Sequence, residues 1–232
     1  MTGKLSKRQK AISALYDKGK HYKLDEALDI LKDLPKGKFD ETVELGMNLT
    51  LNAKNPTDIV RGTALLPHGT GKTVRIAVFC RGENEKKAKE EGAEFIGSDE
   101  LIKKVSAGWC DFDVAIAETG MMREIAKLGK ILGPRGLMPN PKTGTVTDDI
   151  TKAVKEVRAG KIEFKMDKQS GLHAGVGKIS FSKEALCENI KKLLNSILSS
   201  NAALTRPQAI KSVTISRTMG PGLKLDISEF RR

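Results

Sequence analysis

The chain has 232 residues, 39% of them hydrophobic and 30% charged, which is typical of a folded protein with one large or two ordinary domains. Its 41 Lys and Arg residues outnumber its 29 Asp and Glu residues, and the net charge of +12 favours a polyanionic partner such as nucleic acid. No apolar run reaches the roughly 18 residues of a transmembrane helix, and the N-terminus has no secretory signal, so we expect a cytoplasmic protein without a membrane partner.

The first 69 residues predict helices and then strands, from the period of their apolar residues. Apolar positions recur at helical spacing as far as Pro35, which ends the pattern. From Val43 to Leu51 they alternate strictly with polar positions, as in a strand with one buried face. The expected elements are a basic helix at 5–18, a helix at 24–34, strands at 43–51 and 60–66, and a turn at 52–58.

Residues 70–160 change to an alternation of strands and helices. The run from Val74 to Cys80 is apolar on both faces apart from Arg75, as in a parallel strand covered on two sides. The alternation that follows predicts a small doubly wound, Rossmann-like α/β unit. The expected elements are strands at 74–80, 94–96 and 112–117 and helices at 83–91, 98–105, 121–132 and 148–158.

From Lys161 onward the alternating pattern of the first segment returns. Ile162, Phe164 and Met166 predict a strand, and residues 173–181 predict its partner strand. Ser182 can cap a long helix that has a single apolar stripe. Two further strands are expected at 213–215 and 223–227.

Neither end segment has enough strands to close a sheet by itself. We therefore predict that residues 1–69 and 161–232 form one split α+β domain, into which residues 70–160 are inserted as the doubly wound domain. The two chain crossings would lie side by side, and glycine at paired crossings favours a hinge. The predicted hinge residues are Gly69, Gly71 and Gly160.

The cations are segregated along the chain. Residues 59–82, 125–147 and 190–225 contain Lys and Arg but no acid, and residues 1–23 hold seven cations and one acid. Several basic surfaces that serve solubility are the alternative to a surface that binds nucleic acid. Only 4% of residues are aromatic and they are not clustered, which favours structured RNA over extended single strands. DNA is less favoured, because no helix-turn-helix or zinc finger is recognisable.

The sequence offers no recognisable catalytic or metal site. Residues Gly69–Thr73 lack the first glycine of a P-loop, since Leu66 occupies that position, and they lead into a strand. Cys80, Cys110 and Cys187 are scattered without metal-ligand spacing. We expect reduced thiols, no metal, no cofactor and no enzyme activity. A small-molecule-binding enzyme that uses the doubly wound domain and a basic DNA-binding regulator are the alternatives.

Residues Leu132–Val146 hold three of the eight prolines, three glycines, two cations and no acid. Proline and glycine at this density exclude a helix or an ordinary strand. We expect a stiff loop whose free backbone N–H groups can face an anion. It is either a connector between the domains or a direct ligand contact.

This loop and two other motifs resemble the L-one family of large-subunit ribosomal proteins, the proteins of the mobile ribosomal stalk. The other motifs are Lys38-Phe-Asp-Glu-Thr-Val43 and Ser216-Arg-Thr-Met-Gly-Pro-Gly222. The resemblance covers the whole chain and implies the same split domain with an insertion. It departs at Lys54–Asp58, which is less basic than the family leads us to expect.

The resemblance implies a structural role in the large subunit through binding of stalk rRNA, a part in the release of exit-site tRNA, and repression of the protein's own operon mRNA by the free monomer. Phe39 and Met219 would offer apolar surface to sugars and bases, and Gly220 would let an RNA backbone come close. Glu41 is expected to orient a neighbour. The implied RNA-binding residues are Lys38, Phe39, Thr42, Lys168, Lys178, Ser216, Thr218, Met219 and Gly220.

Overall fold

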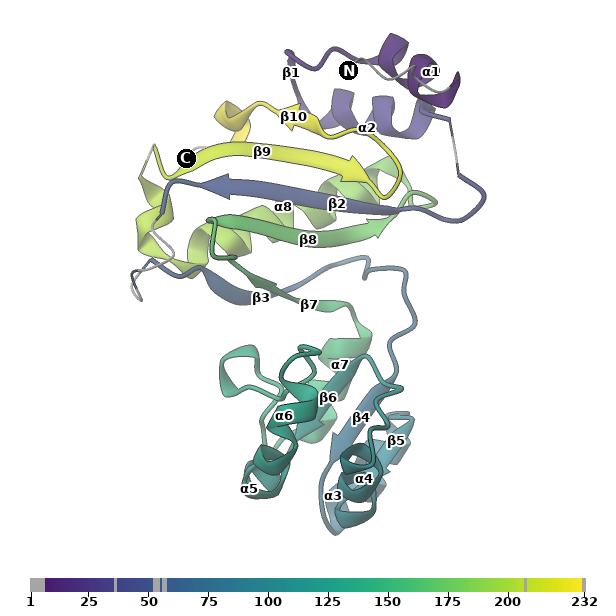
Figure 1. Cartoon of the computed structure of the whole chain (residues 1–232), viewed down its shortest axis with the longest axis vertical. Helices are drawn as coiled ribbons and strands as arrows, with labels where there is room; N and C mark the ends of the chain where they lie inside the picture. Colours follow the sequence, from purple (N-terminus) through teal and green to yellow (C-terminus); the bar gives the residue numbers. More distant parts are fainter. Residues whose placement is uncertain (1–6, 36, 52–54, 56–57, 207, 231–232) are drawn as a thin grey trace. The chain divides into compact units, whose positions relative to one another are not determined.

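The computed structural model describes residues 7–35, 37–51, 55, 58–206 and 208–230, and Figure 1 labels its elements. The chain divides into two compact units: unit 1 contains Met1–Gly71 and Ile162–Arg232, and unit 2 contains Lys72–Lys161. Both units combine helices with strands, which confirms the predicted mixed α/β fold class. The start of the predicted N-terminal helix and most of the turn expected at 52–58 lie outside the described residues.

Unit 1 is built around a five-stranded sheet in the order β1-β10-β9-β2-β8. Strand β2 comes from the N-terminal segment and is antiparallel to both β8 and β9, which come from the C-terminal segment. The two ends of the chain therefore share one sheet (Figure 1). Its strands are β1 (His21–Tyr22), β2 (Thr42–Leu49), β8 (Gly171–Lys178), β9 (Ile210–Arg217) and β10 (Leu223–Leu225).

The two faces of this sheet differ in chemistry. Val43 and Leu45 of β2 are fully buried, whereas Glu44 and Asn48 point to the opposite face and are exposed. The buried face carries the core that the sheet shares with the helices. The strict alternation in the sequence predicted this division correctly, because successive side chains of a strand point to opposite faces.

The described residues of unit 1 form three α-helices, and α8 passes behind the sheet as it is seen in Figure 1. The predicted cap of α8 is present, since the Ser182 hydroxyl accepts the N–H of Ala185 at 3.1 Å. None of the helices in the described part of the chain is both long and apolar enough to cross a membrane. The helices are α1 (Lys7–Leu15), α2 (Leu24–Asp33) and α8 (Lys183–Ser200), with 3₁₀ turns η4 (Ala202–Thr205) and η5 (Ile227–Phe230).

Strand β7 (Lys161–Lys165) does not pair with β8 along its length, contrary to the sequence prediction. It pairs with β3 (Arg61–Leu65) in a separate two-stranded sheet, and Met166, directly after β7, forms an isolated bridge with Leu172 near the start of β8. A tight turn separates β7 from β8, because the Asp167 carboxylate accepts the N–H groups of Gln169 and Gly171. Beyond this turn β8 follows the edge of β2, which offers it a longer partner of matching alternation.

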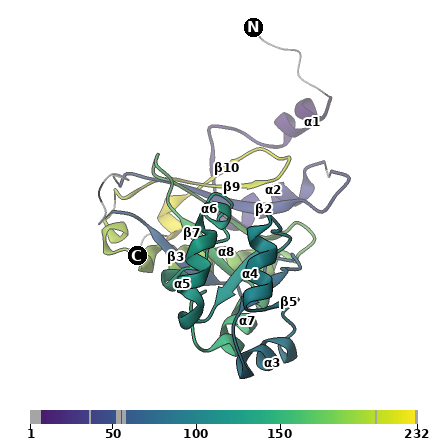
Figure 2. The same ribbon diagram turned by 60° about the horizontal axis from the view of Figure 1, so that its bottom comes forward.

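Unit 2 contains a three-stranded parallel sheet in the order β5-β4-β6, with helices on both faces (Figure 2). Phe79 of β4 packs in a core with α4, and Val78 packs in a second core with α3 and α7. Burial on both faces explains why β4 is apolar throughout. The elements are β4 (Ile76–Phe79), α3 (Glu83–Glu90), β5 (Phe95–Gly97), α4 (Asp99–Ser106), β6 (Val114–Ala117) and α7 (Ile150–Arg158).

The single helix predicted at 121–132 is broken into short pieces. Met121, Ile125, Leu128 and Leu132 keep helical spacing and are buried, so the broken segment still presents one apolar face to the core. The last of the three breaks falls where Gly129, a poor helix former, begins α6. The pieces are η1 (Thr119–Met121), α5 (Met122–Ile125), η2 (Ala126–Leu128) and α6 (Gly129–Leu132), and a further 3₁₀ turn, η3, spans Pro141–Thr143.

A buried amide fixes the chain near the point where it leaves unit 1. Asn189 of α8 is fully buried, and its side-chain oxygen accepts the N–H of His68 at 3.1 Å. Its Nδ2 donates to the carbonyl oxygens of Gly69 at 3.0 Å and Val176 at 2.8 Å. The amide thereby ties this stretch of chain to both α8 and β8.

We expect Asn189→Leu to lower the free energy of unfolding by about 1–3 kcal/mol, because the backbone groups that the amide binds lose their partner. Urea denaturation followed by circular dichroism measures the effect. Asn195→Leu is the matched control, since Asn195 lies on the exposed side of the same helix. Equal losses in the two variants would contradict the anchoring role of Asn189.

Candidate nucleic-acid interface

Three strand ends meet at one corner of the unit 1 sheet. β2 begins at Thr42, opposite Lys178 at the end of β8, and Arg217 at the end of β9 lies opposite the next residue of β2. We call this region, with the loops 37–41 and 218–220, the corner. It contains seven of the nine predicted RNA-binding residues: Lys38, Phe39, Thr42, Lys178, Thr218, Met219 and Gly220.

Hydrogen bonds between Thr42 and Thr218 join the two loops of the corner. The N–H of Thr42 donates to Oγ1 of Thr218 at 3.0 Å, and the N–H of Thr218 donates to the carbonyl of Thr42 at 3.0 Å. The ammonium group of Lys178 donates to Oγ1 of Thr42 at 2.9 Å. These hydroxyls are held in fixed positions by the protein, and a hydroxyl oxygen has a second lone pair for a ligand.

The corner also exposes apolar surface. Phe39 and Met219 are each 55% exposed, which is unusual for side chains of this size. Their neighbours Lys38 and Thr218 are exposed as well. Exposed apolar side chains beside cations and hydroxyls make the corner a candidate contact surface.

Two of the predicted residues lie outside the corner. The first, Lys168, is in the turn before β8. The whole length of β8 separates it from Lys178, which ends that strand at the corner. Ser216 lies within β9 opposite Glu44, on the polar face of the sheet next to the corner. The structure therefore brings Ser216 near the other residues and leaves Lys168 at the opposite end of the sheet.

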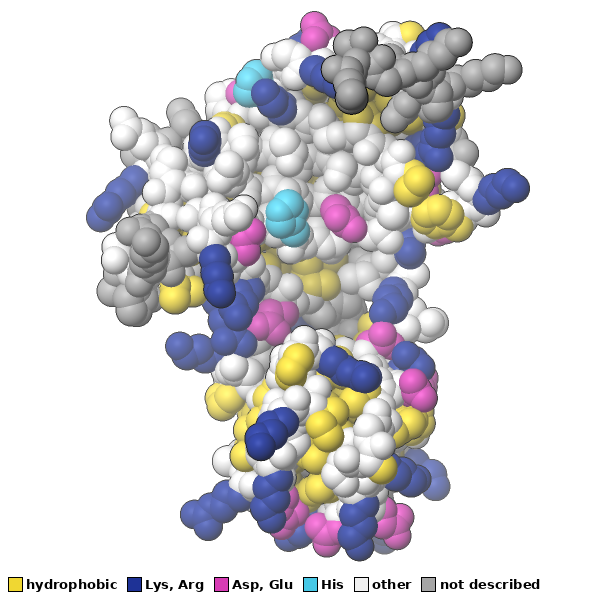
Figure 3. All heavy atoms as spheres, in the orientation of Figure 1, with side chains coloured by type: hydrophobic (Ala, Val, Ile, Leu, Met, Phe, Trp, Pro, Cys, Tyr) yellow, Lys and Arg dark blue, Asp and Glu magenta, His cyan; other side chains and the backbone are white. Residues whose placement is uncertain are grey.

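The polar face of the sheet continues away from the corner. A row across it consists of His173, Gly46, Thr214 and Lys224, which lie opposite one another in successive strands. Figure 3 shows this face as a surface of mostly small, uncharged side chains. Sequence reasoning did not single out these residues, because a polar strand face by itself indicates no more than exposure to solvent.

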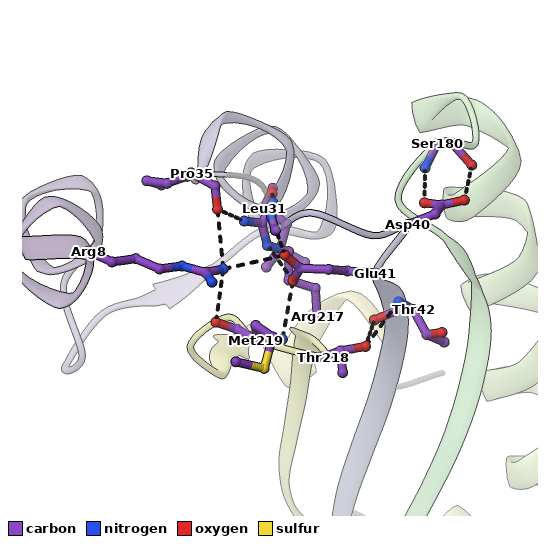
Figure 4. Close-up of polar contacts among 11 residues, drawn as sticks. Arg8, Leu31, Pro35, Asp40, Glu41, Thr42, Ser180, Arg217, Thr218 and Met219 are labelled. Atoms are coloured by element: carbon purple, nitrogen blue, oxygen red, sulfur yellow. Dashed lines mark hydrogen bonds and ion pairs between the residues drawn. The ribbon is translucent and has the colours of Figure 1, made fainter. Parts of the chain in front are cut away.

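A buried ion pair lies beneath the corner. The side chains of Glu41 and Arg217 are 1% and 0% exposed, and Nε of Arg217 lies 3.2 Å from Oε2 of Glu41 (Figure 4). Burial lowers the pKa of Arg217, the carboxylate of Glu41 opposes this shift, and the charge of Arg8 adds to it. Sequence reasoning assigned Glu41 to orienting a neighbour but missed Arg217, which looks in the sequence like one more surface cation.

Gly220 has a reason within the protein to lack a side chain. A Cβ atom at this position would lie 2.7 Å from Cγ of Arg217. Because Arg217 is buried, its stem has little room to move aside. The packing of Arg217 therefore requires glycine here, in addition to any close approach of RNA from outside.

The predicted hinge glycines all have positive φ, at 65° for Gly69, 68° for Gly71 and 99° for Gly160. Gly69 is held by the amide of Asn189, and a Cβ at Gly71 would lie 2.8 Å from Cγ of Lys178. These two glycines therefore belong to the packed part of unit 1, and Gly160 directly follows α7 and its C-cap. The hinge itself stays a prediction.

The loop Leu132–Val146 uses much of its backbone internally, so the expectation of free N–H groups is wrong for several of them. The carbonyl of Asn140 accepts the N–H groups of Thr143 at 3.2 Å and Thr145 at 3.3 Å. The Asn140 side chain accepts the N–H of Lys142 at 2.9 Å. Asn140 thus organises a turn that bonds to itself. Earlier in the same loop, the side chain of Arg135 is exposed.

Unit 2 offers little to an anionic ligand at the carboxyl ends of its strands, where α/β units commonly bind small molecules. The guanidinium of Arg81, directly after β4, donates to the carboxylates of Glu124 at 2.9 Å and Asp99 at 3.3 Å. Burial raises the pKa of the neighbouring Cys80 thiol to about 11, so it remains protonated at neutral pH. The described residues contain no cluster of His, Cys, Asp and Glu that could hold a metal ion.

These features define a two-unit α/β protein with an exposed corner on the sheet that both chain ends build. Comparison with known proteins identifies the family to which such a chain belongs. The profile of the ribosomal protein L1p/L10e family matches residues 31–221, and the chain belongs to this family. It is 50% identical over 227 residues to the large ribosomal subunit protein uL1 of Protochlamydia amoebophila, covering 98% of this chain and 96% of that protein. The uL1 protein of Kosmotoga olearia is 50% identical (96% of each chain), and that of Saccharophagus degradans is 48% identical (98% of each chain).

These comparisons confirm the family that the three sequence motifs resemble. Membership of a family of ribosomal proteins also agrees with the expectation that the chain is structural and not an enzyme.

We expect Gly220→Ala to destabilise the protein by about 1–3 kcal/mol, because the added methyl group would overlap the buried stem of Arg217. Gly222→Ala is the matched control, since nothing lies within 4 Å of a Cβ built there. Thermal denaturation of both variants measures the difference. Equal melting temperatures would mean that the loop shifts to accommodate the methyl group without loss of stability.

Proposed function

We propose that this protein is a structural constituent of the large ribosomal subunit and binds the rRNA of the stalk directly through the corner. Family membership supports this, because the relatives are named as large ribosomal subunit proteins. The observation that carries the proposal is the exposure of Phe39 and Met219, two large apolar side chains on loops that the sheet brings together. The place of action is then the cytoplasmic ribosome.

The corner supplies the chemical groups by which proteins recognise folded RNA. The hydroxyls of Thr42 and Thr218 suit ribose 2′-OH groups, and the ring of Phe39 suits a base or sugar face. Lys38 and Lys178 supply positive charge for phosphates. One exposed aromatic ring with fixed polar groups around it fits a shaped RNA junction better than a run of stacked single-stranded bases.

Two finer roles rest on the family resemblance. The protein takes part in the release of exit-site tRNA, and as a free monomer it represses translation of its own operon mRNA. Repression is then competition between rRNA and mRNA for the corner, so free protein occupies the mRNA only when rRNA is saturated. A hinge at the two chain crossings, which include Gly71 and Gly160, suits a protein of a moving stalk.

The rival functions are less well supported. For a small-molecule-binding enzyme based on unit 2, the carboxylates bound to Arg81 at the strand ends disfavour an anionic substrate there. A thermal-shift screen with nucleotides tests it against a titration with stalk RNA. A DNA-binding regulator would bind duplex DNA at least as well as folded RNA at equal salt concentration.

We expect Phe39→Ala to weaken binding to a stalk rRNA fragment by roughly 1–3 kcal/mol, the usual contribution of an aromatic side chain stacked on nucleic acid. The fold should remain intact, because Phe39 is largely exposed. Leu65→Ala is the matched control, since Leu65 is 44% exposed on β3, away from the corner. Filter binding or fluorescence anisotropy gives both affinities, and an unchanged affinity for Phe39→Ala would remove this residue from the interface.

We expect the logarithm of the RNA affinity to fall linearly with the logarithm of salt concentration, by about 0.7–0.9 for each phosphate that the protein neutralises. Lys38→Gln should reduce this slope by about one such step, because Lys38 is exposed at the corner. Lys168→Gln, at the far end of β8, should leave the slope unchanged. The opposite ranking of these two variants would move the phosphate contacts away from the corner.

A further inference from the structure

A single buried carboxylate connects the two loops of the corner. Oε1 of Glu41 accepts the N–H of Gly37 at 2.8 Å. Its Oε2 accepts the N–H of Met219 at 3.2 Å (Figure 4). The packing is close, since a Cβ at Gly37 would lie 2.7 Å from Oε1. The loop that carries Phe39 and the loop that carries Met219 are thus bound to opposite oxygens of one side chain.

Two arginines complete this arrangement from different parts of the chain. Arg217 pairs with Glu41 and donates to the carbonyl of Leu31 at 3.0 Å and to the carbonyl of Pro35. Arg8 of helix α1 lies 3.4 Å from Oε1 of Glu41 and donates to the carbonyl of Met219 at 3.5 Å. Both backbone groups of Met219 therefore have a partner in the cluster, the N–H in Glu41 and the carbonyl in Arg8.

Stability alone gives a weak account of this cluster. Taking an ion pair out of water is costly, and apolar side chains of similar size often replace such pairs without loss of stability. Moreover, Gly37 and Met219 lie in loops at the surface, where water could satisfy their N–H groups. The distinctive effect of the cluster is geometric, because it fixes the spacing between two exposed loops.

We propose that Glu41 is a positioning residue for RNA recognition, which holds the loops of Phe39 and Met219 at one spacing, and that Arg8 brings helix α1 into the same device. The inference rests on the proposed RNA-binding function. RNA then meets a preorganised surface and does not have to order two loops on binding, which improves affinity without any direct contact from Glu41. The effect should appear mainly as slower dissociation of the RNA complex.

The first test removes both buried charges together, with Glu41→Leu and Arg217→Met in the full chain, so that no ion remains buried alone. We expect affinity for a stalk rRNA fragment to fall at least tenfold, with an unchanged salt slope because no phosphate contact is lost. The matched control, Glu163→Leu with Arg61→Met, removes the ion pair of 3.0 Å between β7 and β3. It should bind RNA like the unaltered protein.

The second test needs no change in the buried core. Arg8→Gln removes the partner of the Met219 carbonyl from a side chain that is 35% exposed. Lys10→Gln makes the same change of charge on the exposed side of the same helix. We expect Arg8→Gln to weaken RNA binding at least threefold more than Lys10→Gln, with equal salt slopes and melting temperatures within a few degrees of each other.

The results of these two tests decide whether Glu41 and Arg8 position the loops for RNA. Unchanged affinity in the double variant would overturn the proposal, and if that variant does not fold, the Arg8→Gln comparison decides alone. A smaller salt slope for Arg8→Gln would mean that Arg8 contacts phosphate directly, which also overturns the positioning role. If the unaltered protein itself shows no preference for stalk RNA, the proposed function fails, whereas failure of the inference alone leaves the effect of Phe39→Ala intact.

Discussion

Strand β2 is hydrogen-bonded on both edges to strands that follow it by more than a hundred residues, and the rest of unit 1 depends on this pairing. Its register places Thr42 beside Lys178 and Val43 beside Arg217, so loops from distant parts of the sequence must end at the same corner. A slip by one residue would turn the apolar side chains of β2 to the polar face. The burial of those side chains therefore also specifies the geometry of the interface.

The sequence predicted those features that depend on local periodicity. The alternation in β2, the apolar stripe and cap of α8 and the apolar run of β4 all appear as expected, because burial of one or both faces is encoded residue by residue. The pairing of β7 with β3 was not predictable in this way, since two strands of similar pattern compete for one partner and only tertiary packing decides. The two-residue strand β1 is likewise too short to show a period.

The residues of the candidate site also fall into those that the sequence could predict and those that only the structure reveals. Motif resemblance identified the exposed residues of the corner, but it could not show that Lys168 lies a full strand length from Lys178. Nor could it distinguish Arg217, which is buried, from the surface cations near it in the sequence. Periodicity does place Arg217 on the inward face of β9, yet a charged residue at such a position is ordinarily explained by the end of a strand. Its partners from the other end of the chain, the Glu41 carboxylate and the carbonyls of Leu31 and Pro35, account for its burial.

The corner is built from two distant segments of the chain, so the proposed RNA ligand would act on unit 1 as a whole. A ligand that contacts residues 38–42 and 218–220 links segments that are far apart in the sequence and meet only when the unit 1 sheet is formed. Its binding free energy therefore adds to the stability of unit 1, because unfolding of that sheet would separate the two halves of the interface. Unit 2 has its own parallel sheet with a core on each face, so its folding does not depend on the corner. A change confined to the core of unit 2 therefore leaves the sheet that builds the corner in place.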